Sequence, residues 1–211
     1  MSDLFYMQDS RSNVGSRAMF WRDGGGYTSN LDEAEQFTRE RAVRQYECRE
    51  TDLPWPVEYV RAMAHIGVDF QYLDLTPEQA ITAAPVGERF YVAYKQAWDG
   101  NCLIWNTPAT GPTSNLANAS IWMREQIAGF PLADYVPWPK TYIDQHSRPV
   151  VPANLLNHKQ ALRSVGLKLP KIKPQRQKWR SYITNCHGCG RFLSEAQRYG
   201  YCPNCDASNA P

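Results

Sequence analysis

The stretch Leu53-Pro-Trp-Pro-Val-Glu-Tyr59 returns later in the chain as Val136-Pro-Trp-Pro-Lys-Thr-Tyr142. Matching stretches precede both blocks in the same order and at a nearly constant offset: Phe5-Tyr6-Met7 with Phe90-Tyr91-Val92, Thr28-Ser29-Asn30-Leu31 with Thr113-Ser114-Asn115-Leu116, and Arg39-Glu40 with Arg124-Glu125. Met19-Phe20-Trp21 matches Leu103-Ile104-Trp105 if one position of slip is allowed. Matches that keep their order and spacing indicate an internal duplication. The alternative interpretation is two similar aromatic-rich hairpins.

Hydrophobic periodicity and turn residues predict a similar order of elements in both halves. We expect strands over residues 4–9, 18–21, 27–31, 89–94 and 102–106, and helices over residues 38–50, 76–84, 120–128 and 154–165. Thr76-Pro-Glu-Gln79 has the residues of a helix capping box. The sequence therefore predicts an α+β fold. Two tandem ββα-type repeats, residues 1–75 and 88–156, pack as one body, and a linker helix over residues 76–87 joins them.

The repeated block places Trp55 and Trp138 between prolines, with a tyrosine one helical turn later. A rigid corner that carries a large aromatic side chain favours a role in the core, and the alternative is a paired aromatic groove for a partner. The helix expected over residues 120–128 is more apolar than its counterpart because it contains Ile121, Trp122 and Ile127. We interpret this difference as burial of the second repeat, with a partner surface as the alternative.

Charge is distributed unevenly along the 211 residues. Residues 1–144 contain 12 Lys/Arg and 19 Asp/Glu, whereas residues 145–211 contain 11 and 2, and none of the acidic residues lies between Gln145 and Ser194. An acidic body therefore carries a basic arm, and such arms most often contact phosphate backbones. The alternative is an arm that folds back onto its own acidic body.

The C-terminal end of the chain contains four of the six cysteines, arranged as Cys186-His-Gly-Cys189 and Cys202-Pro-Asn-Cys205. Two Cys-x-x-Cys pairs at this separation can surround one metal ion, and we expect one structural Zn²⁺ per chain. Four thiolates would fill the coordination shell and leave no position for a catalytic water. An iron site or a redox dithiol is the alternative. We expect Phe192, Tyr199 and Tyr201 to form the small core of this segment, and His187 to be an exposed turn residue.

Residues 183–206 resemble the four-cysteine zinc ribbons of nucleic-acid-handling and protein-docking modules. We divide the C-terminal part into a basic helix and linker, residues 157–181, and a zinc ribbon, residues 182–211. Basic residues lead into the ribbon with one interleaved tryptophan that could stack on a base. The expected nucleic-acid contacts are Lys168, Lys171, Lys173, Arg176, Lys178, Trp179 and Arg180. No base-reading pattern is visible, so backbone contacts should dominate and binding should depend on salt.

The first repeat resembles a small module common in uncharacterised bacteriophage and prophage proteins. Its matching residues are Phe5-Tyr-Met-Gln-Asp-Ser-Arg-Ser-Asn-Val-Gly15, Phe20-Trp21, Gly26-Tyr-Thr28, Leu31-Asp-Glu-Ala34 and Phe37-Thr38. The second repeat lacks the Asp-Ser-Arg and Leu-Asp-Glu-Ala parts. The resemblance implies a phage accessory protein that acts on host machinery in the bacterial cytoplasm, and it implies no catalytic residues.

We expect a cytoplasmic, non-enzymatic protein, because no nucleophile, base and orienting group occur together and no long apolar stretch predicts a membrane span. The favoured function is binding of nucleic acid, or of a nucleic-acid-handling complex, through the arm and ribbon. One alternative is a protein-binding inhibitor of a host machine, such as an anti-defence factor or an RNA polymerase regulator. Another is an enzyme acting on nucleic acid, with the ribbon as its anchor.

Overall fold

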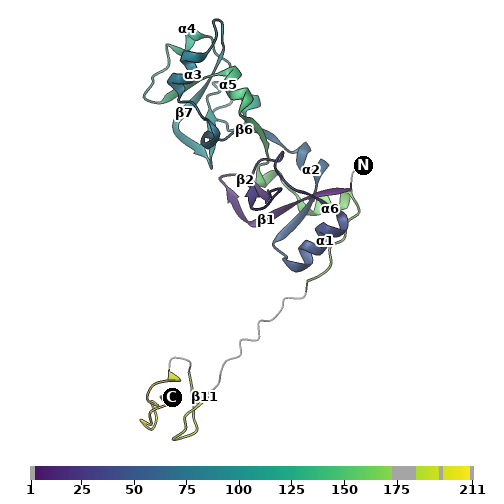
Figure 1. Ribbon diagram of the computed structural model, residues 1–211, viewed down its shortest axis with the longest axis vertical. Coiled ribbons are helices and arrows are strands. Elements are labelled where there is room, and N and C mark those ends of the chain that lie inside the picture. The colour runs from purple at the N-terminus through teal and green to yellow at the C-terminus, as the bar shows by residue number, and fades with distance from the viewer. Residues whose placement is uncertain (1–2, 173–183, 195–196, 210–211) are drawn as a thin grey trace. The chain divides into compact units, whose positions relative to one another are not determined.

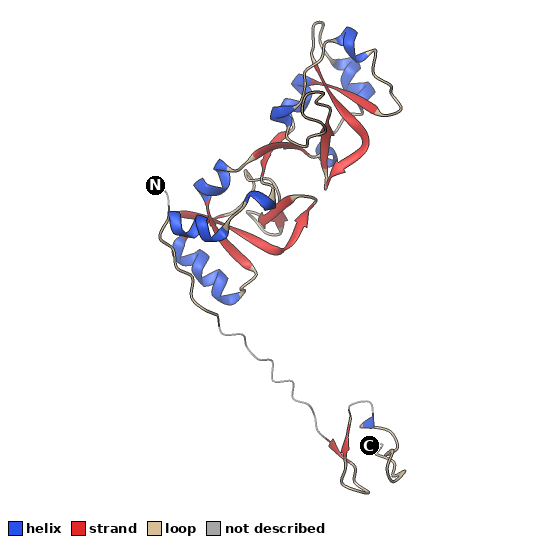
Figure 2. Cartoon of the chain, turned by 180° about the vertical axis from the view of Figure 1, so that it is seen from behind, coloured by secondary structure: helices blue, strands red, loops and turns tan. Residues whose placement is uncertain are grey.

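The computed structural model describes residues 3–172, 184–194 and 197–209. The chain divides into two compact units, Met1–Lys171, which we call the body, and Ile172–Pro211, which contains the expected ribbon. Helices and antiparallel strands are mixed within the body, which confirms the α+β class (Figure 1, Figure 2). No helix in the described parts of the chain is long and apolar enough to cross a lipid bilayer.

The first half of the body is built on the long strand β1 (Leu4–Val14). Four shorter strands complete its sheet: β2 (Arg17–Trp21), β3 (Tyr27–Thr28), β4 (Gln36–Thr38) and β5 (Asp52–Pro56). Helix α1 (Arg39–Cys48) begins where the Thr38 side chain accepts a hydrogen bond from the Arg41 amide. Pro56 ends β5, and α2 (Val57–Ala62) follows directly. The expected strand at 18–21 and the helix at 38–50 are therefore confirmed within one or two positions.

The second half is built in the same way on β7 (Phe90–Asp99). Its sheet has the order β8-β7-β9, with β8 (Cys102–Trp105) and β9 (Tyr135–Pro139), and α5 (Lys140–Gln145) follows the second Pro-Trp-Pro block. Helix α4 (Arg124–Ile127) is a single turn and much shorter than α1. The expected helix at 120–128 is therefore limited to residues 124–127, and the 3-10 turn η2 (Leu116–Asn118) precedes it.

The strand pairs of the two halves correspond. Tyr6 pairs with Trp55 as Tyr91 pairs with Trp138. Gln8 pairs with Phe20, and Ala93 pairs with Trp105. Along the chain, the separation of Ala93 from Gln8 equals the separation of Trp105 from Phe20. The one-position slip expected from the sequence is therefore wrong, because strand pairing places Phe20 and Trp105, rather than Trp21 and Trp105, at equivalent positions.

The C-terminal part of each half packs against the other half. Strand β6 (His65–Val68) pairs antiparallel with β10 (Ser147–Val150), and the 3-10 turns η1 (Phe70–Tyr72) and η3 (Ala153–Leu155) follow these strands. Helix α3 (Pro77–Ala83) then packs against β9, and α6 (His158–Ser164) packs against β5. Figure 1 shows α3 beside the sheet of β7, and α6 near α1. Two corresponding segments thus cross between the halves.

Both expected linkers turn out to belong to the body. The capping box of Thr76 and Gln79 is present, but α3 buries Ala80 against Trp138 in the core of the second half, so residues 76–87 are more than a connection. Residues 157–171 likewise belong to the body, because α6 buries Ala161 and Leu167 is buried just beyond it. The boundary expected at residue 157 is therefore wrong, since the amphipathic face of α6 is covered.

Trp55 and Trp138 are buried in separate cores, which confirms their role in packing. Tyr59 stacks on Trp55 with ring centroids 6.1 Å apart, and Tyr142 stacks on Trp138 at 5.8 Å. By contrast, Ile121 is 45% exposed, because it precedes the single turn of α4 and lies outside any helix. The expected burial of this apolar segment is therefore wrong at Ile121.

Candidate metal centre

The described residues of the ribbon form two tight turns and a short hairpin. Strand β11 (Thr184–Asn185) pairs with β12 (Phe192–Leu193), and the first turn between them carries Cys186 and Cys189. The second turn carries Cys202 and Cys205. The four sulfur atoms lie within 4.8 Å of one another, so the structure brings together all four ligands expected from the sequence.

The sulfur positions are suited to one tetrahedral ion. Cys186 Sγ and Cys205 Sγ are 3.6 Å apart, and Cys189 Sγ and Cys202 Sγ are 3.7 Å apart. Zinc–sulfur bonds of about 2.3 Å in a tetrahedron place the sulfurs about 3.8 Å apart. The cluster could therefore hold a metal ion.

The two turns have the same backbone hydrogen bonds. The Gly190 amide donates to the Cys186 carbonyl at 2.8 Å, and the Asp206 amide donates to the Cys202 carbonyl at 2.9 Å. Gly190 and Asp206 both have positive φ, 74° and 54°, and each follows the second cysteine of its pair. Each turn therefore presents its two sulfurs to the same point.

Hydrogen bonds within the turns shift the pKa values of the cysteine thiols. The backbone bond at Cys189 lowers the pKa of the Cys186 thiol to about 6, and the Gly188 amide, 3.3 Å from that sulfur, acts in the same direction. The Arg191 backbone lowers the pKa of Cys189. The Ala207 backbone favours the Cys205 thiolate, but the Cys189 sulfur and desolvation oppose it and raise the pKa of Cys205 to about 12. Part of the site is thus prepared to bind as thiolate.

Two further residues hold the turns together, and cysteine spacing alone did not reveal them. A Cβ atom at Gly188 would lie 2.7 Å from the Ala207 Cβ and 3.3 Å from the Cys205 Sγ, so only glycine allows the turns to approach this closely. The Asn209 side chain accepts from the His187 amide at 3.3 Å and donates to the Ala207 carbonyl at 3.2 Å. His187 is exposed, as expected.

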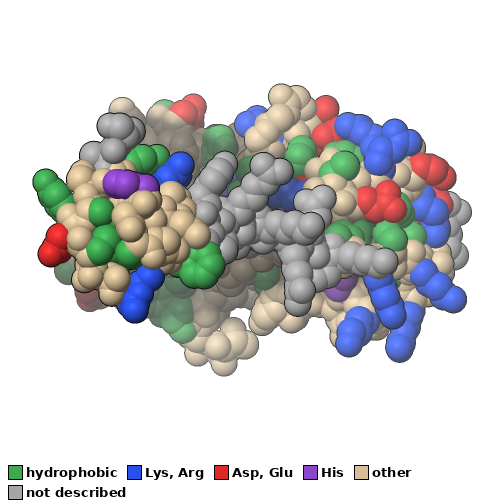
Figure 3. Space-filling view, turned by 90° about the horizontal axis from the view of Figure 1, so that it is seen from below, with side chains coloured by type: hydrophobic (Ala, Val, Ile, Leu, Met, Phe, Trp, Pro, Cys, Tyr) green, Lys and Arg blue, Asp and Glu red, His purple; other side chains and the backbone are tan. Residues whose placement is uncertain are grey.

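The aromatic residues expected in the ribbon core lie on its surface instead. Phe192, Tyr199 and Tyr201 are 75%, 61% and 73% exposed. Leu193 is buried against Cys186 and Cys202, with Ala207 beside them. Side chains alternate across a strand, so Leu193 faces the sulfurs and Phe192 faces away. Apolar side chains are visible on the surface of the ribbon in Figure 3.

The expected nucleic-acid contacts are only partly described. Lys168 and Lys171 are exposed at the end of the body. Lys173, Arg176, Lys178, Trp179 and Arg180 lie outside the described residues.

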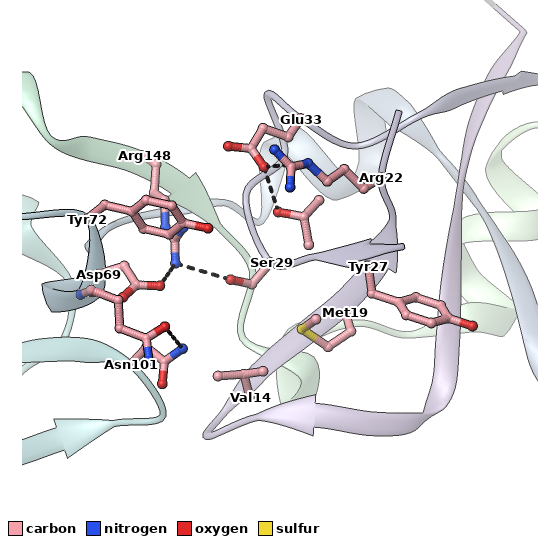
Figure 4. A pocket seen from close by; sticks show the side chains of 12 residues that line it. Val14, Met19, Arg22, Tyr27, Ser29, Glu33, Asp69, Tyr72, Asn101 and Arg148 are labelled. Carbon is pink, nitrogen blue, oxygen red and sulfur yellow. Dashed lines mark hydrogen bonds and ion pairs between the residues drawn. The ribbon is translucent and has the colours of Figure 1, made fainter. Parts of the chain in front are cut away.

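A second feature of the body is a small polar hollow of about 110 Å³ between η1 and the β2–β3 hairpin (Figure 4). Arg148 pairs there with the buried Asp69 and donates to the Ser29 hydroxyl at 3.4 Å. Arg22 pairs with Glu33 at 3.2 Å. These charged groups neutralise one another, so the hollow has less to offer a ligand than the cysteine cluster.

Comparison of the chain with protein-family models, with curated proteins and with solved structures finds no match. The indications of function are those of the chain itself: a cluster of four cysteines that could hold a metal ion, preceded by a basic stretch of sequence.

Proposed function

We propose that this chain is a non-enzymatic, phage-type accessory protein of the bacterial cytoplasm that binds nucleic acid, or a nucleic-acid-handling complex, through its basic arm and ribbon. The charge distribution is the observation that carries the proposal. Residues 145–211 contain 11 Lys/Arg and 2 Asp/Glu, and the four-cysteine centre lies within this basic part. A concentrated positive segment beside an acidic body is an electrostatic guide for phosphate backbones.

The metal in this proposal is one structural Zn²⁺ per chain. Four cysteine sulfurs within 4.8 Å of one another are a typical zinc ligand set, and four protein ligands close the coordination shell. The ion would hold Cys186, Cys189, Cys202 and Cys205 together and so fold a segment that has very little apolar core of its own. This role requires no chemistry at the metal.

The exposed aromatic side chains of the ribbon support a stacking role. Phe192, Tyr199 and Tyr201 present their rings to solvent, and Arg191, next to Phe192, is also exposed. Bases of a single strand stack on such rings with about 1–3 kcal/mol each, while cations contact the phosphates. The basic arm would supply the salt-dependent part of the affinity, and the ribbon would supply the stacking part.

We expect the zinc-loaded protein to bind a fluorescein-labelled single-stranded oligonucleotide with an affinity that falls steeply as salt rises. Each neutralised phosphate contributes about 0.7 to the slope of log K against log salt. Changing Lys173, Arg176, Lys178 and Arg180 together to glutamine should therefore reduce the slope by about 3, as measured by fluorescence anisotropy. Lys159→Gln changes an exposed lysine of α6; it is the control and should leave the slope nearly unchanged. An unchanged slope in the fourfold variant argues against the proposal.

A protein-binding inhibitor of a host machine, such as an anti-defence factor or an RNA polymerase regulator, is the second candidate. The exposed rings of Phe192 and Tyr201 favour it, because aromatic residues are also enriched at protein interfaces. In that case the full-length protein would bind neither single-stranded nor double-stranded nucleic acid at low salt.

For the body, we propose a tandem ββα duplication in which the two repeats exchange their C-terminal segments. The contacts at the two crossings support this interpretation. The Phe70 amide donates to the Asn101 carbonyl at 3.0 Å, and the Ala153 amide donates to the Ser16 carbonyl at 2.8 Å. Two further hydrogen bonds join each C-terminal segment to the opposite half. The Leu75 amide donates to the Tyr142 hydroxyl at 3.0 Å, and the Asn157 amide donates to the Tyr59 hydroxyl at 3.2 Å.

We expect the two halves to stay together after the chain is cut between them. A protease site introduced at Val86, which is fully exposed, allows this cut in the intact protein. Because β6 pairs with β10, and α3 and α6 pack on the opposite halves, the cut protein should elute as a 1:1 complex in gel filtration. A second protease site within residues 173–183 is the control, because cutting there should release the ribbon. Separation of the halves in native buffer would contradict the exchange.

A further inference from the structure

The basic part of the sequence begins on the surface of the body. Three exposed cations follow one another there: Arg163 lies near the end of α6, and Lys168 and Lys171 lie in the segment that follows this helix. Figure 3 shows several Lys and Arg side chains on the visible face of the body. We call these three residues the exit surface, because the chain leaves the body just beyond them.

The backbone that carries Lys168 is fixed to the body. Leu167 is buried in the core cluster of β1 and α1, and Leu169 packs against the same cluster. Just before them, the Arg39 guanidinium of α1 donates a hydrogen bond of 2.9 Å to the Val165 carbonyl. Lys168 lies between the two leucines and is exposed, so its ammonium group reaches solvent from an anchored segment.

The packing of α6 places Arg163. Leu162 packs against the same core cluster, and Arg163, the next residue, is exposed. Lys159 lies one turn earlier, at the end of α6 where the ring centroids of His158 and Trp55 are 4.8 Å apart. We therefore count Lys159 with the Pro-Trp-Pro corner and not with the exit surface.

The charges of the exit surface are not neutralised within the described part of the chain. The sequence has no acidic residue between positions 145 and 194. On the neighbouring helix α1, by contrast, Arg39 and Arg41 pair with Asp3 and Glu35. The three cations of the exit surface form no ion pair with any residue that the structure describes. Unpaired cations that are close in sequence attract a polyanion and release its counterions on binding.

We propose that the exit surface contacts the phosphate backbone of the nucleic acid, so that the interface begins on the body and continues along the chain into the arm. The proposal rests on the nucleic-acid binding proposed above and adds to it a surface with a fixed place in the fold. The planar guanidinium of Arg163 can bind a phosphate through two hydrogen bonds, and Lys168 and Lys171 act as point charges. Phosphate contacts carry no sequence information, so the exit surface adds affinity and salt dependence without a base preference.

The test measures binding of a fluorescein-labelled single-stranded oligonucleotide to the full-length, zinc-loaded protein by fluorescence anisotropy at a series of salt concentrations. Changing Arg163 and Lys168 together to glutamine should lower the slope of log K against log salt by about 1.4, because each lost phosphate contact contributes about 0.7. Both side chains are exposed, so the variant should keep the fold of the body.

The matched control changes Lys95 and Arg124 together to glutamine. These exposed residues of β7 and α4 belong to the second half, and their loss changes the net charge by the same amount. The slope should keep its wild-type value in this control. Equal falls in the two double variants would show an effect of net charge alone and overturn the proposal.

The same titrations separate this proposal from the one on which it rests. If the fourfold variant of the arm lowers the slope and the Arg163 and Lys168 variant does not, nucleic-acid binding stands and the exit surface is wrong. If the wild-type protein does not bind the oligonucleotide, both proposals fail. In the ¹⁵N-labelled wild-type protein, the amide signals of residues 163–171 should shift when the oligonucleotide is added. Shifts confined to the chain beyond residue 172 would overturn the proposal.

Discussion

Changing Cys202 to serine is expected to abolish metal binding and unfold the ribbon. Cys202 is buried, its sulfur lies 3.7 Å from that of Cys189, and the apolar core beside it consists of little more than Leu193. Metal binding contributes about 10–16 kcal/mol to the folding of comparable zinc modules, far more than this small core can supply. Bound zinc should fall from one ion per chain to none by elemental analysis, and the dispersed amide signals of residues 184–209 should collapse.

Cys48→Ser is the matched control for this experiment, because Cys48 is an exposed free cysteine on α1 of the body. This variant should keep both the zinc and the ribbon signals. The body should unfold at the same temperature in both variants, since it forms a compact unit of its own. A Cys202→Ser protein whose Leu193 amide stays dispersed after treatment with a chelator would show that the ribbon folds without metal.

Trp105→Ala is expected to destabilise the body by about 3–5 kcal/mol, the usual cost of removing a fully buried large aromatic side chain. Trp105 has no exposed surface, and its ring centroid lies 5.6 Å from that of Tyr91. Its indole nitrogen has no hydrogen-bond partner among the residues that the structure describes, so we attribute the loss to packing. Urea unfolding followed by far-UV circular dichroism measures the change in the free energy of unfolding.

The form of the urea transition tests the exchange between the halves. Val68 and Ala80, from the crossing segment, lie in the same core as Trp105, so the whole body should unfold in one transition at lower urea. Trp98→Ala is the control, because Trp98 is 47% exposed, and it should cost no more than about 1 kcal/mol. If the Trp105→Ala variant unfolds in two separate transitions, with the first half still folded after the first of them, the crossing segment does not couple the stability of the two halves.

The candidate site was largely predictable because its chemistry is local. The four ligands follow from two Cys-x-x-Cys pairs, since a two-residue gap places both sulfurs of a pair on one side of a turn. The sequence did not predict which side chains of the ribbon face the sulfurs and which face solvent. Leu193 rather than Phe192 lies beneath the sulfurs, and this depends on the register of a two-residue strand pair. Gly188 and Asn209 matter only once the two turns are in contact.

The sequence by itself determined the repeated Pro-Trp-Pro corners, the positions of most strands and helices and the four-cysteine cluster, because each is encoded within a few neighbouring residues. The uneven charge follows from composition alone. Only the tertiary structure decided which half each C-terminal segment covers, since an amphipathic pattern shows which face of α3 or α6 is apolar but not which sheet that face packs on. The path of the chain decided which of the segments that follow α3 and α6 is buried. Leu167 is buried and Val86 is exposed because the chain is free to continue past α6, whereas after α3 it must enter β7.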